Sequence, residues 1–330
     1  VKYRPRRFSD VVNQEHVVRT LQNALRLGRI SRAYLFAGPR GVGKTTIARI
    51  LAMALNCEQG PAPEPCGQCE SCRRIAVGQS LDVIEIDGAS NRGIDEIRNL
   101  KEQIRYPPAS SRFKIYIIDE VHMLTTEAFN ALLKVLEEPP EYLVFMFATT
   151  DPHRIPKTVL SRVQRFDLRP ITPEDIVSRL KRVAEAEGIE AEEEAFWEIA
   201  RHSEGSMRDA LVMLEQLWVY SGGLITRRDV LNLLGVVERD YYLKLIEFVR
   251  EQDPAGALRH LEALFQRGYT PADFTRGLVS FLAELLEAKL GLAPDPELAK
   301  AASGFTKEDL VAFSQIAFEL ESSLGYRANP

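Results

Sequence analysis

The sequence predicts an α/β domain built on a parallel β-sheet, followed by two helical domains. Short apolar runs alternate with helical segments from about residue 33, and most positions within each run are apolar. Such runs are typical of parallel strands that helices cover on both faces. After residue 168 the strand patterns end and helical patterns continue. A phosphate-binding motif directly after the first run is typical of a nucleotide-binding sheet.

Five runs are expected to form the strands of this sheet. They cover residues 33–38, 81–87, 113–119, 142–150 and 162–168. The pattern of residues 126–138 predicts a helix, which Pro139 and Pro140 end.

The remainder of the chain is expected to be helical. Thr172, Pro173 and Glu174 form a helix start. Residues 169–235 are expected to form a small domain whose last helix covers 226–235. Residues 236–330 are expected to form a second one, with helices over 241–252, 254–268, 270–291 and 306–325. The predicted division is therefore 1–168, 169–235 and 236–330.

Composition and charge narrow the class of protein. The chain is 45% hydrophobic and 27% charged, and its longest apolar run, Tyr142–Ala148, is far shorter than the roughly 20 residues of a membrane span. No apolar segment follows the basic N-terminus, so we expect no secretory signal and a cytoplasmic location with reduced thiols. The sequence starts at Val1 rather than Met, and we expect a trimmed chain.

The net charge of −5 is unevenly distributed. Residues 1–56 contain eleven Lys and Arg side chains and only two acidic ones, Asp10 and Glu15. A basic N-terminal region can bind nucleotide phosphate, a nucleic-acid backbone or an acidic neighbour, and ordinary solvated surface is the alternative.

The motif G-x-x-x-x-G-K-T follows the first predicted strand and opens a helix. In such a loop, backbone N–H groups and the helix N-terminus surround an anion, the lysine neutralises the β- and γ-phosphates, and the threonine hydroxyl reaches Mg²⁺. The expected nucleotide-binding residues are Gly38, Pro39, Arg40, Gly41, Val42, Gly43, Lys44, Thr45 and Thr46.

Two carboxylates, Asp119 and Glu120, end the third strand and emerge at the carboxyl edge of the sheet, beside the phosphate loop. Asp119 is expected to hold Mg²⁺ through water, and Glu120 to polarise the attacking water. A helix cap is the alternative interpretation of such a pair.

Three further features are consistent with an ATPase that acts at a subunit boundary. Thr149 and Thr150 end the next strand and can contact the γ-phosphate, Arg162 precedes a strand, and Arg208 begins a later helix. Each arginine alone could be a surface salt-bridge partner.

All four cysteines lie in one stretch, the cysteine loop (residues 57–72), with the spacing C-x8-C-x2-C-x2-C. Cys57, Cys66, Cys69 and Cys72 can complete a tetrahedral zinc site with no open position, which predicts a structural metal. We expect removal of such a metal to leave ATP binding unchanged. An iron–sulfur cluster and redox-active thiols are the alternatives.

These motifs resemble the AAA+ superfamily and, within it, the gamma/tau family of bacterial DNA polymerase III, the ATPases of the sliding-clamp loader. The resemblance extends over the whole chain and is most specific at 3–17, 33–57, 86–98, 129–140, 160–166 and 205–211. It implies an AAA+ P-loop domain with a parallel sheet and an inserted zinc module, then a small helical lid domain and a C-terminal helical collar domain.

The resemblance also implies roles for individual residues. Thr150 would be a sensor, Arg162 an arginine finger acting on ATP held by a neighbouring subunit, and Arg208 a contact to the γ-phosphate in its own subunit. Ser-Arg-Val stands where the family usually has Ser-Arg-Cys. Residues near the adenine would be Tyr3, Arg4, Pro5, Val11 and Val12.

The segment 90–103 resembles the family's helix that lines the central chamber. Arg92, Arg98 and Lys101 would contact primer-template DNA, and pairing within the helix with Asp95, Glu96 or Glu102 is the alternative.

The implied activity is an ATPase within the DNA polymerase III holoenzyme, with ATP, Mg²⁺ and Zn²⁺ and without a polymerase active site in this chain. The implied partners are the other clamp-loader subunits in a five-membered ring, the sliding clamp, primer-template DNA and, through a C-terminal extension, a DNA polymerase, but no membrane. Another AAA+ remodelling ATPase and a scaffold subunit that binds nucleotide without turnover are the alternatives.

Overall fold

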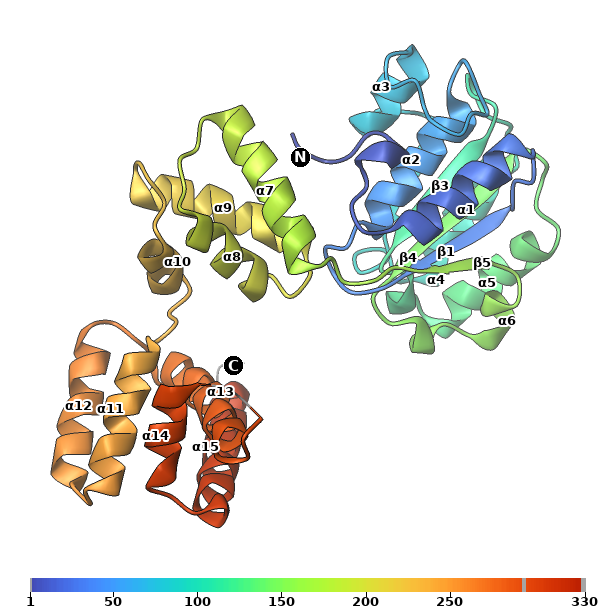
Figure 1. The fold of residues 1–330 in the computed structure, drawn as a ribbon. Coiled ribbons are helices and arrows are strands. Elements are labelled where there is room, and N and C mark those ends of the chain that lie inside the picture. The colour runs from blue at the N-terminus through green and yellow to red at the C-terminus, as the bar shows by residue number, and fades with distance from the viewer. Residues whose placement is uncertain (1, 293–294, 328–330) are drawn as a thin grey trace. The chain divides into compact units, whose positions relative to one another are not determined.

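The structure, a computed structural model, describes residues 2–292 and 295–327, and the chain divides into two compact units, 1–216 and 217–330. Figure 1 labels most of the helices and strands. The division falls within helix α9 (Met207–Ser221). The three-domain boundaries expected above stay a prediction.

The first unit contains a five-stranded parallel sheet in the order β2-β3-β4-β1-β5. Its strands are β1 (Ala33–Ala37), β2 (Val83–Asp87), β3 (Lys114–Asp119), β4 (Leu143–Thr149) and β5 (Gln164–Asp167). All five predicted strands and their parallel arrangement are confirmed. The register places Ala37 beside Thr149 and Asp87 beside Asp119, so the carboxyl ends of the strands meet along one edge.

Burial separates the central strands from the edge strands. Every residue of β1 and β4 is buried, and so is β3 up to Asp119. In β2 and β5, in contrast, exposed and partly exposed positions predominate. The expectation of strands covered on both faces is therefore wrong for β5, an edge strand in which only Phe166 is buried. It is confirmed in part for β2, the other edge strand, where Val83 and Ile84 pack against the cores on opposite faces.

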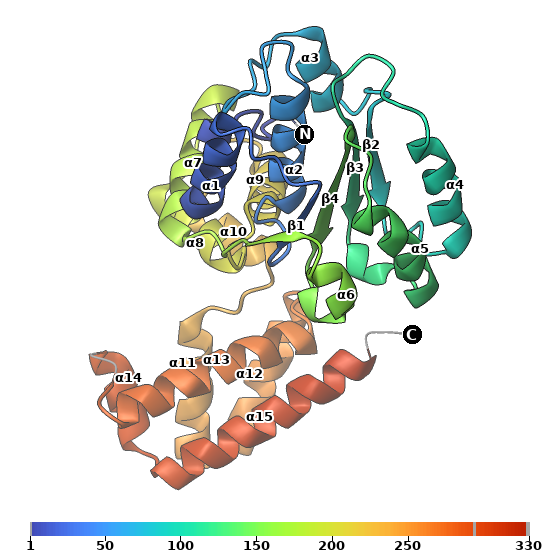
Figure 2. The same cartoon turned by 90° about the vertical axis from the view of Figure 1, so that its right-hand side faces the viewer.

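Helices cover both faces of the sheet (Figure 2). On one face, α1 (Glu15–Arg26), α2 (Lys44–Asn56) and α3 (Glu70–Ala76) pack around a core that includes Tyr34 and Phe36. On the other, α4 (Ile94–Ile104) and α5 (Thr126–Glu137) pack on Tyr116 and Phe145. The helix predicted over 126–138 is thus confirmed as α5.

Short helical turns complete the α/β part of the unit. They are η1 (Phe8–Asp10), η2 (Val121–Met123), η3 (Pro152–Arg154) and α6 (Lys157–Leu160).

Three helices follow the sheet: α7 (Pro173–Glu187), α8 (Glu193–His202) and α9. The predicted start at Thr172 is confirmed, because its side chain accepts a hydrogen bond from the Asp175 backbone N–H and Pro173 occupies the first turn. Ser206 caps α9 in the same way, accepting from the Asp209 N–H at 3.2 Å.

In the second unit, the described residues after α9 form helices α10 to α15. Their bounds are Arg227–Leu233, Arg239–Arg250, Pro254–Gln266, Pro271–Lys289, Pro296–Ser303 and Lys307–Arg327. Helix α14 was not predicted. It is short, but Asp295 caps it and Leu298 and Ala302 bury its inner face.

The predicted helices over 226–235, 241–252, 254–268, 270–291 and 306–325 are confirmed within a few residues at each end. Residues 293–294 and 328–330 of the predicted last domain lie outside the described residues. No helix in the described part of the chain combines the length and apolar character that a membrane crossing requires.

Candidate active site

The phosphate loop connects the end of β1 to the start of α2, and its glycines adopt conformations that other residues avoid. Gly43, immediately before α2, has φ 106°, and Gly41 has φ 76°. A Cβ atom on Gly41 would lie 1.8 Å from Ser206 Oγ, so the loop packs directly against the start of α9. The loop is thereby fixed between the sheet and the helices that follow it.

Lys44, the first residue of α2, is nearly fully buried, with 6% of its surface exposed. Its Nζ donates to the carbonyl oxygens of Gly38 at 2.9 Å and Pro39 at 2.7 Å. Burial lowers the pKa of Lys44, and the charges of Glu120 and Asp119 oppose this shift. An anion in the loop would give this ammonium a stronger partner than the two carbonyls.

Thr45 and Asp119 meet at the carboxyl edge of the sheet. The Thr45 hydroxyl donates to Asp119 Oδ2 at 2.7 Å, although the two residues are 74 positions apart. A hydroxyl and a carboxylate in contact are oxygen ligands of the kind that Mg²⁺ prefers. This donor set therefore fits the magnesium site expected from the sequence.

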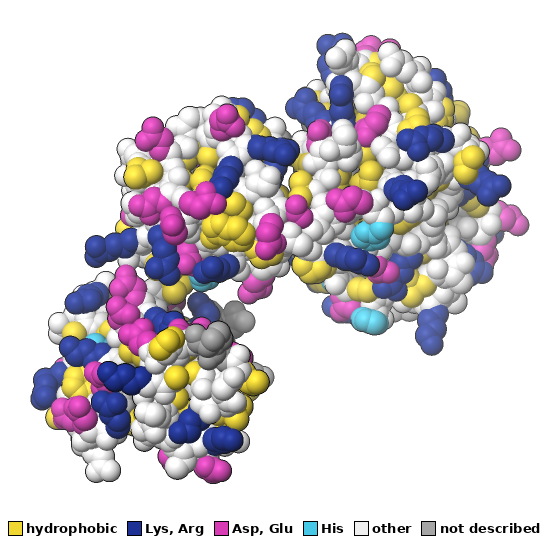
Figure 3. Space-filling model, viewed as in Figure 1, with side chains coloured by type: hydrophobic (Ala, Val, Ile, Leu, Met, Phe, Trp, Pro, Cys, Tyr) yellow, Lys and Arg dark blue, Asp and Glu magenta, His cyan; other side chains and the backbone are white. Residues whose placement is uncertain are grey.

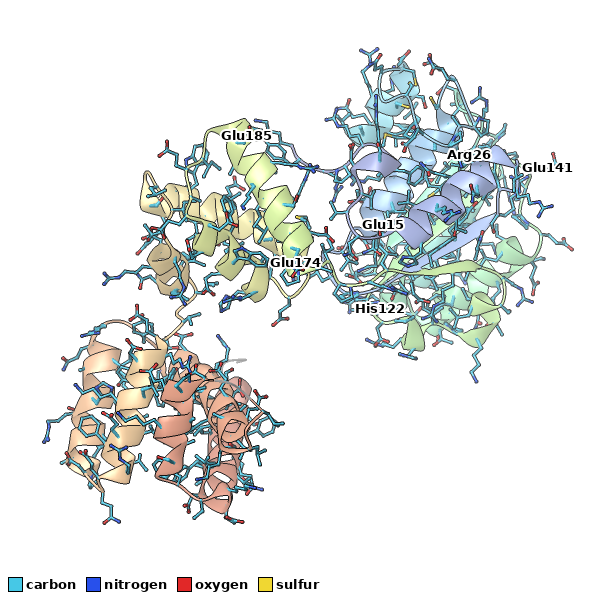
Figure 4. The ribbon with its side chains drawn as sticks, viewed as in Figure 1. Glu15, Arg26, His122, Glu141, Glu174 and Glu185 are labelled. Carbon is cyan, nitrogen blue, oxygen red and sulfur yellow. The ribbon has the colours of Figure 1, made fainter. Side chains whose placement is uncertain are left out.

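Glu120 has φ 45°, a conformation that is uncommon for a residue with a side chain and is frequent at functional sites. Its Oε2 accepts hydrogen bonds from the Thr150 hydroxyl at 2.9 Å and the Thr150 N–H at 3.2 Å. His122, labelled in Figure 4, places Nδ1 3.3 Å from the same oxygen and 3.0 Å from Thr149 Oγ1. The carboxylate and both threonines expected at the site are thus brought together.

A group of arginines lies near these carboxylates. Arg49 forms a two-pronged ion pair with Glu85 on β2, with both hydrogen bonds at 2.7 Å. The pKa of Arg4 is lowered, first by desolvation and then by the positive charge of Arg49, with Arg208 acting in the same direction. Arg4 therefore lies within electrostatic reach of both Arg208 and Asp119.

The other residues expected near the adenine lie in the N-terminal strap, which we define as residues 2–14. Tyr3 donates its hydroxyl to Glu187 on α7, and its carbonyl accepts from Arg179 at 3.0 Å. Val11 packs against the core that contains Phe8. Pro5 and Val12 are half-buried. Within the phosphate loop, Val42 is buried, Thr46 is half-buried and Arg40 is exposed.

Arg162 points to residues outside the phosphate loop. Its guanidinium pairs with Glu137 at 2.8 Å and donates to Thr158 O at 2.7 Å and Ser161 Oγ at 3.1 Å. None of these contacts connects Arg162 to Lys44 of its own chain.

Arg92 and Arg98, expected to contact DNA, are exposed and Lys101 is half-buried. Arg98 pairs with Asp95 at 3.0 Å, which is the alternative interpretation for this residue, and Arg92 donates to Ala89 O at 2.7 Å. On the face that Figure 3 shows, basic and acidic side chains are interspersed.

The four cysteines form a compact cluster, with all four Sγ atoms within 4.8 Å of one another. The Sγ atoms of Cys66 and Cys72 are 4.0 Å apart, close to the roughly 3.8 Å that tetrahedral Zn–S bonds of about 2.3 Å require. Backbone N–H groups of Cys69 and Gln68 lower the pKa of Cys66 to about 6, whereas burial raises that of Cys72. The set fits a four-thiolate metal site.

Sequence reasoning missed three contacts of this region. His122 follows Glu120 by two residues, and its proximity to the expected catalytic pair was an available signal. Ser206 and Glu64 carried no comparable signal, because their partners lie in distant segments of the chain.

Comparisons with known proteins now add to this geometry. Three family models match the chain: "DNA polymerase III, delta subunit" over residues 13–172, "DNA polymerase III clamp loader subunit, ATPase lid domain" over 175–223, and "DNA polymerase III subunits gamma and tau domain III" over 225–316.

Among curated relatives, DNA polymerase III subunit tau of Bacillus subtilis is 47% identical over 86% of this chain and 50% of its own length. The tau subunit of Escherichia coli is 46% identical over 81% of this chain and 42% of its own length. The gamma subunit of Buchnera aphidicola is 47% identical over 85% of this chain and 78% of its own length. The chain thus spans about half the length of the two tau relatives and most of the gamma relative.

Solved structures of RuvB from Thermotoga maritima are similar in fold. The Holliday junction branch migration motor has a TM-score of 0.54 and 20% identity, covering 75% of this chain and 79% of that one. A mutant form has the same TM-score with 18% identity, covering 91% and 92%. At this identity the likeness shows the AAA+ fold alone.

Proposed function

The chain belongs to the gamma/tau family of bacterial DNA polymerase III subunits, and on this basis we propose that it is an ATPase motor subunit of the replicative clamp loader. It uses ATP to open the sliding clamp and to place it on primer-template DNA. The observation that carries this proposal is the convergence of Lys44, Thr45, Asp119 and Glu120 at one edge of the sheet. This arrangement supplies charge neutralisation, a metal site and a base beside a phosphate loop.

Each residue of the proposed site has its own role in ATP hydrolysis. The N–H groups of the phosphate loop and the N-terminus of α2 hold the triphosphate, and Lys44 exchanges its two carbonyl partners for phosphate oxygens. Glu120, released from Thr150, orients and deprotonates the attacking water, which forms the new P–O bond as ADP leaves. Before this step, Thr150 contacts the γ-phosphate of the bound ATP once it has separated from Glu120.

Two arginines couple hydrolysis to helix α9 and to the adjacent subunit. Arg208 contacts the γ-phosphate from the start of α9, and the packing of the phosphate loop against the start of this helix at Ser206 supports this role. Arg162 acts on ATP held by the adjacent subunit, for which it must leave its ion pair with Glu137. Such an arginine contributes about 10³–10⁵ in rate in other phosphoryl-transfer enzymes.

Two metals fit the residues present. Thr45 and Asp119 would hold Mg²⁺, which supplies charge neutralisation at the β- and γ-phosphates. Cys57, Cys66, Cys69 and Cys72 would hold Zn²⁺ as a structural ion. Tyr3, Arg4, Pro5, Val11 and Val12 border the adenine.

We further propose three domains: an AAA+ domain (1–168), a lid (169–235) and a collar (236–330) that joins a five-membered ring. The ranges of the three matching models support a three-part division, with breaks at 172–175 and 223–225. Arg92, Arg98 and Lys101 contact the DNA backbone, for which Arg98 must leave Asp95. The protein works in the cytoplasm, and a C-terminal extension would bind the polymerase.

The test is ATP hydrolysis by this chain alone and with its partner subunits, the clamp and primed DNA. The proposal predicts hydrolysis that rises when clamp and primed DNA are added together, and that falls with increasing salt as phosphate contacts are lost. Alanine at Arg92 and Arg98 should reduce the DNA-dependent rise and its salt dependence. Hydrolysis that ignores both clamp and DNA would contradict a clamp-loading role.

A further inference from the structure

The cysteine loop contacts the N-terminal strap through one carboxylate. Glu64, in the spacer between Cys57 and Cys66, accepts hydrogen bonds from the backbone N–H of Phe8 at Oε2 and of Ser9 at Oε1, each at 3.0 Å. Its Oε1 also accepts from Gln22 Nε2 at 3.0 Å. Phe8 and Ser9 are the first two residues of η1, whose N-cap residue Arg7 makes no side-chain cap. Glu64 therefore caps this helical turn from 55 residues away.

Two other contacts join the same elements. Arg7 donates to the carbonyl oxygen of Cys66 at 3.4 Å. Phe8, with 1% of its surface exposed, lies in the same buried cluster as Cys57 and Cys72, and Val11 packs against that cluster. The position of the strap thus depends on the conformation of the cysteine loop.

The other side of the strap is bound to the helices that follow the sheet. Lys2 pairs with Glu187 of α7 at 2.6 Å, and Asn13 donates to Asp175 of α7 at 2.7 Å. Gln14, which is fully buried, exchanges two hydrogen bonds with the backbone of Arg169, at 2.7 and 3.1 Å. The strap therefore links the cysteine loop to α7, and Arg4, between these two sets of contacts in sequence, lies within electrostatic reach of Asp119.

We propose that Glu64 is a positioning residue through which the metal-bound cysteine loop holds the N-terminal strap in the conformation that binds nucleotide. This inference rests on the proposed ATP site. It replaces the expectation that metal removal leaves ATP binding unchanged, because the loop that the metal orders is the loop that holds Phe8 and Ser9.

The cysteine loop requires a metal for this task. Its spacer contains three prolines and little apolar surface, and the hydrogen bonds that thiol sulfur accepts there, from the N–H groups of Cys66 and Cys69, are weak. A bound metal fixes the distance between Cys57 and Cys66, which flank the spacer, and so fixes the place of Glu64. Arg112 supports the loop from the other side, donating to the carbonyl oxygens of Cys57 and Glu58.

The experiment compares the full chain with its Glu64→Gln variant, each with metal and after chelation. Glutamine keeps the size of the side chain, but its amide NH₂ cannot accept from the second backbone N–H. Two readouts are taken: hydrogen exchange at the Phe8 and Ser9 amides, and the Kd for a fluorescent ATP analogue. The matched control is Glu70→Gln, in the same loop, since Glu70 pairs with Arg74 on the surface and does not contact the strap in the described contacts.

With metal content unchanged, Glu64→Gln should speed exchange at both amides and weaken ATP binding by about tenfold, the effect of losing charge-assisted hydrogen bonds. Chelation of the wild type should produce a similar change and add little to the variant. Glu70→Gln should behave as wild type. The proposal fails if Glu64→Gln leaves both readouts unchanged, or if chelation weakens ATP binding by the variant as much as by the wild type.

Failure of the proposed ATP site is distinguishable from failure of this inference. If the wild type binds no ATP, the proposed function fails, but exchange at Phe8 and Ser9 still reports whether Glu64 and the metal hold the strap.

Discussion

Replacement of Gly41 by alanine tests the packing of the phosphate loop against the start of α9. Gly41 has φ 76°, which costs a residue with a Cβ about 1–2 kcal/mol. The new Cβ would lie 1.8 Å from Ser206 Oγ and 2.8 Å from Ser206 Cβ. Rotating the hydroxyl away breaks the cap on the Asp209 N–H, which costs about 1 kcal/mol, and the Cβ contact remains.

Together with the strain of overpacking, these effects should lower the free energy of unfolding of the first unit by about 3–5 kcal/mol and weaken ATP binding. Urea unfolding followed by circular dichroism measures the first quantity, and titration with a fluorescent ATP analogue measures the second. Gly43→Ala is the matched control for stability, because Gly43 has φ 106° but nothing lies within 4 Å of its added Cβ. It should lose only about 1–2 kcal/mol.

The double variant Gly41→Ala with Ser206→Gly separates the two causes. Removing the serine side chain should recover part of the stability lost on Gly41→Ala, since it removes the contact but not the backbone strain. If Gly41→Ala is no less stable than Gly43→Ala, or if Ser206→Gly recovers nothing, the packing argument is refuted.

Three further predictions concern stability and activity. Asp82→Asn should destabilise the protein by roughly 2–3 kcal/mol, because this buried carboxylate accepts from the backbone N–H groups of 109–111, which hold its pKa low against burial. The ionised carboxylate stabilises the folded state fully above its unfolded pKa of about 3.9. The difference in the free energy of unfolding between wild type and Asp82→Asn, measured in urea, should therefore shrink as pH falls through the lower folded pKa. A difference that stays constant down to pH 2 would contradict this. His122→Phe removes the ring nitrogen beside Glu120 Oε2, so the carboxylate loses one of the contacts that position it. This variant should lower kcat about tenfold at unchanged KM, and an unchanged kcat would contradict the prediction. Arg162→Ala should reduce hydrolysis by the assembled ring about 10³-fold while ATP binding persists, and an unaffected ring would exclude the arginine-finger role.

The sequence was sufficient to predict features that depend on local patterns. Nearly continuous apolar runs predicted the strands, and the G-x-x-x-x-G-K-T motif after β1 predicted the loop that the structure places before α2. Thr172 and Pro173 predicted the start of α7. Each of these features is encoded by residues within one turn or one strand of each other.

Features that depend on the meeting of distant segments could not be predicted in this way. The exposure of β2 and β5 follows from strand order, which the apolar runs themselves do not encode. The contact of Gly41 with Ser206 joins segments 165 residues apart, and the hydrogen bonds of Glu64 join segments 42 to 56 residues apart. Helix α14 is short, and the Asp295 cap was its clearest signal.

The central claim is that Glu120 is the base of an ATP site built from Lys44, Thr45 and Asp119. Single-turnover hydrolysis and ATP affinity, measured on Glu120→Gln beside the wild type, test it most directly. The account predicts hydrolysis slower by about 10²–10⁴ with ATP affinity within about threefold of wild type, because glutamine keeps the contact with the Thr150 N–H but cannot accept the proton of water. Hydrolysis at the wild-type rate, or loss of ATP binding in place of hydrolysis, would contradict it.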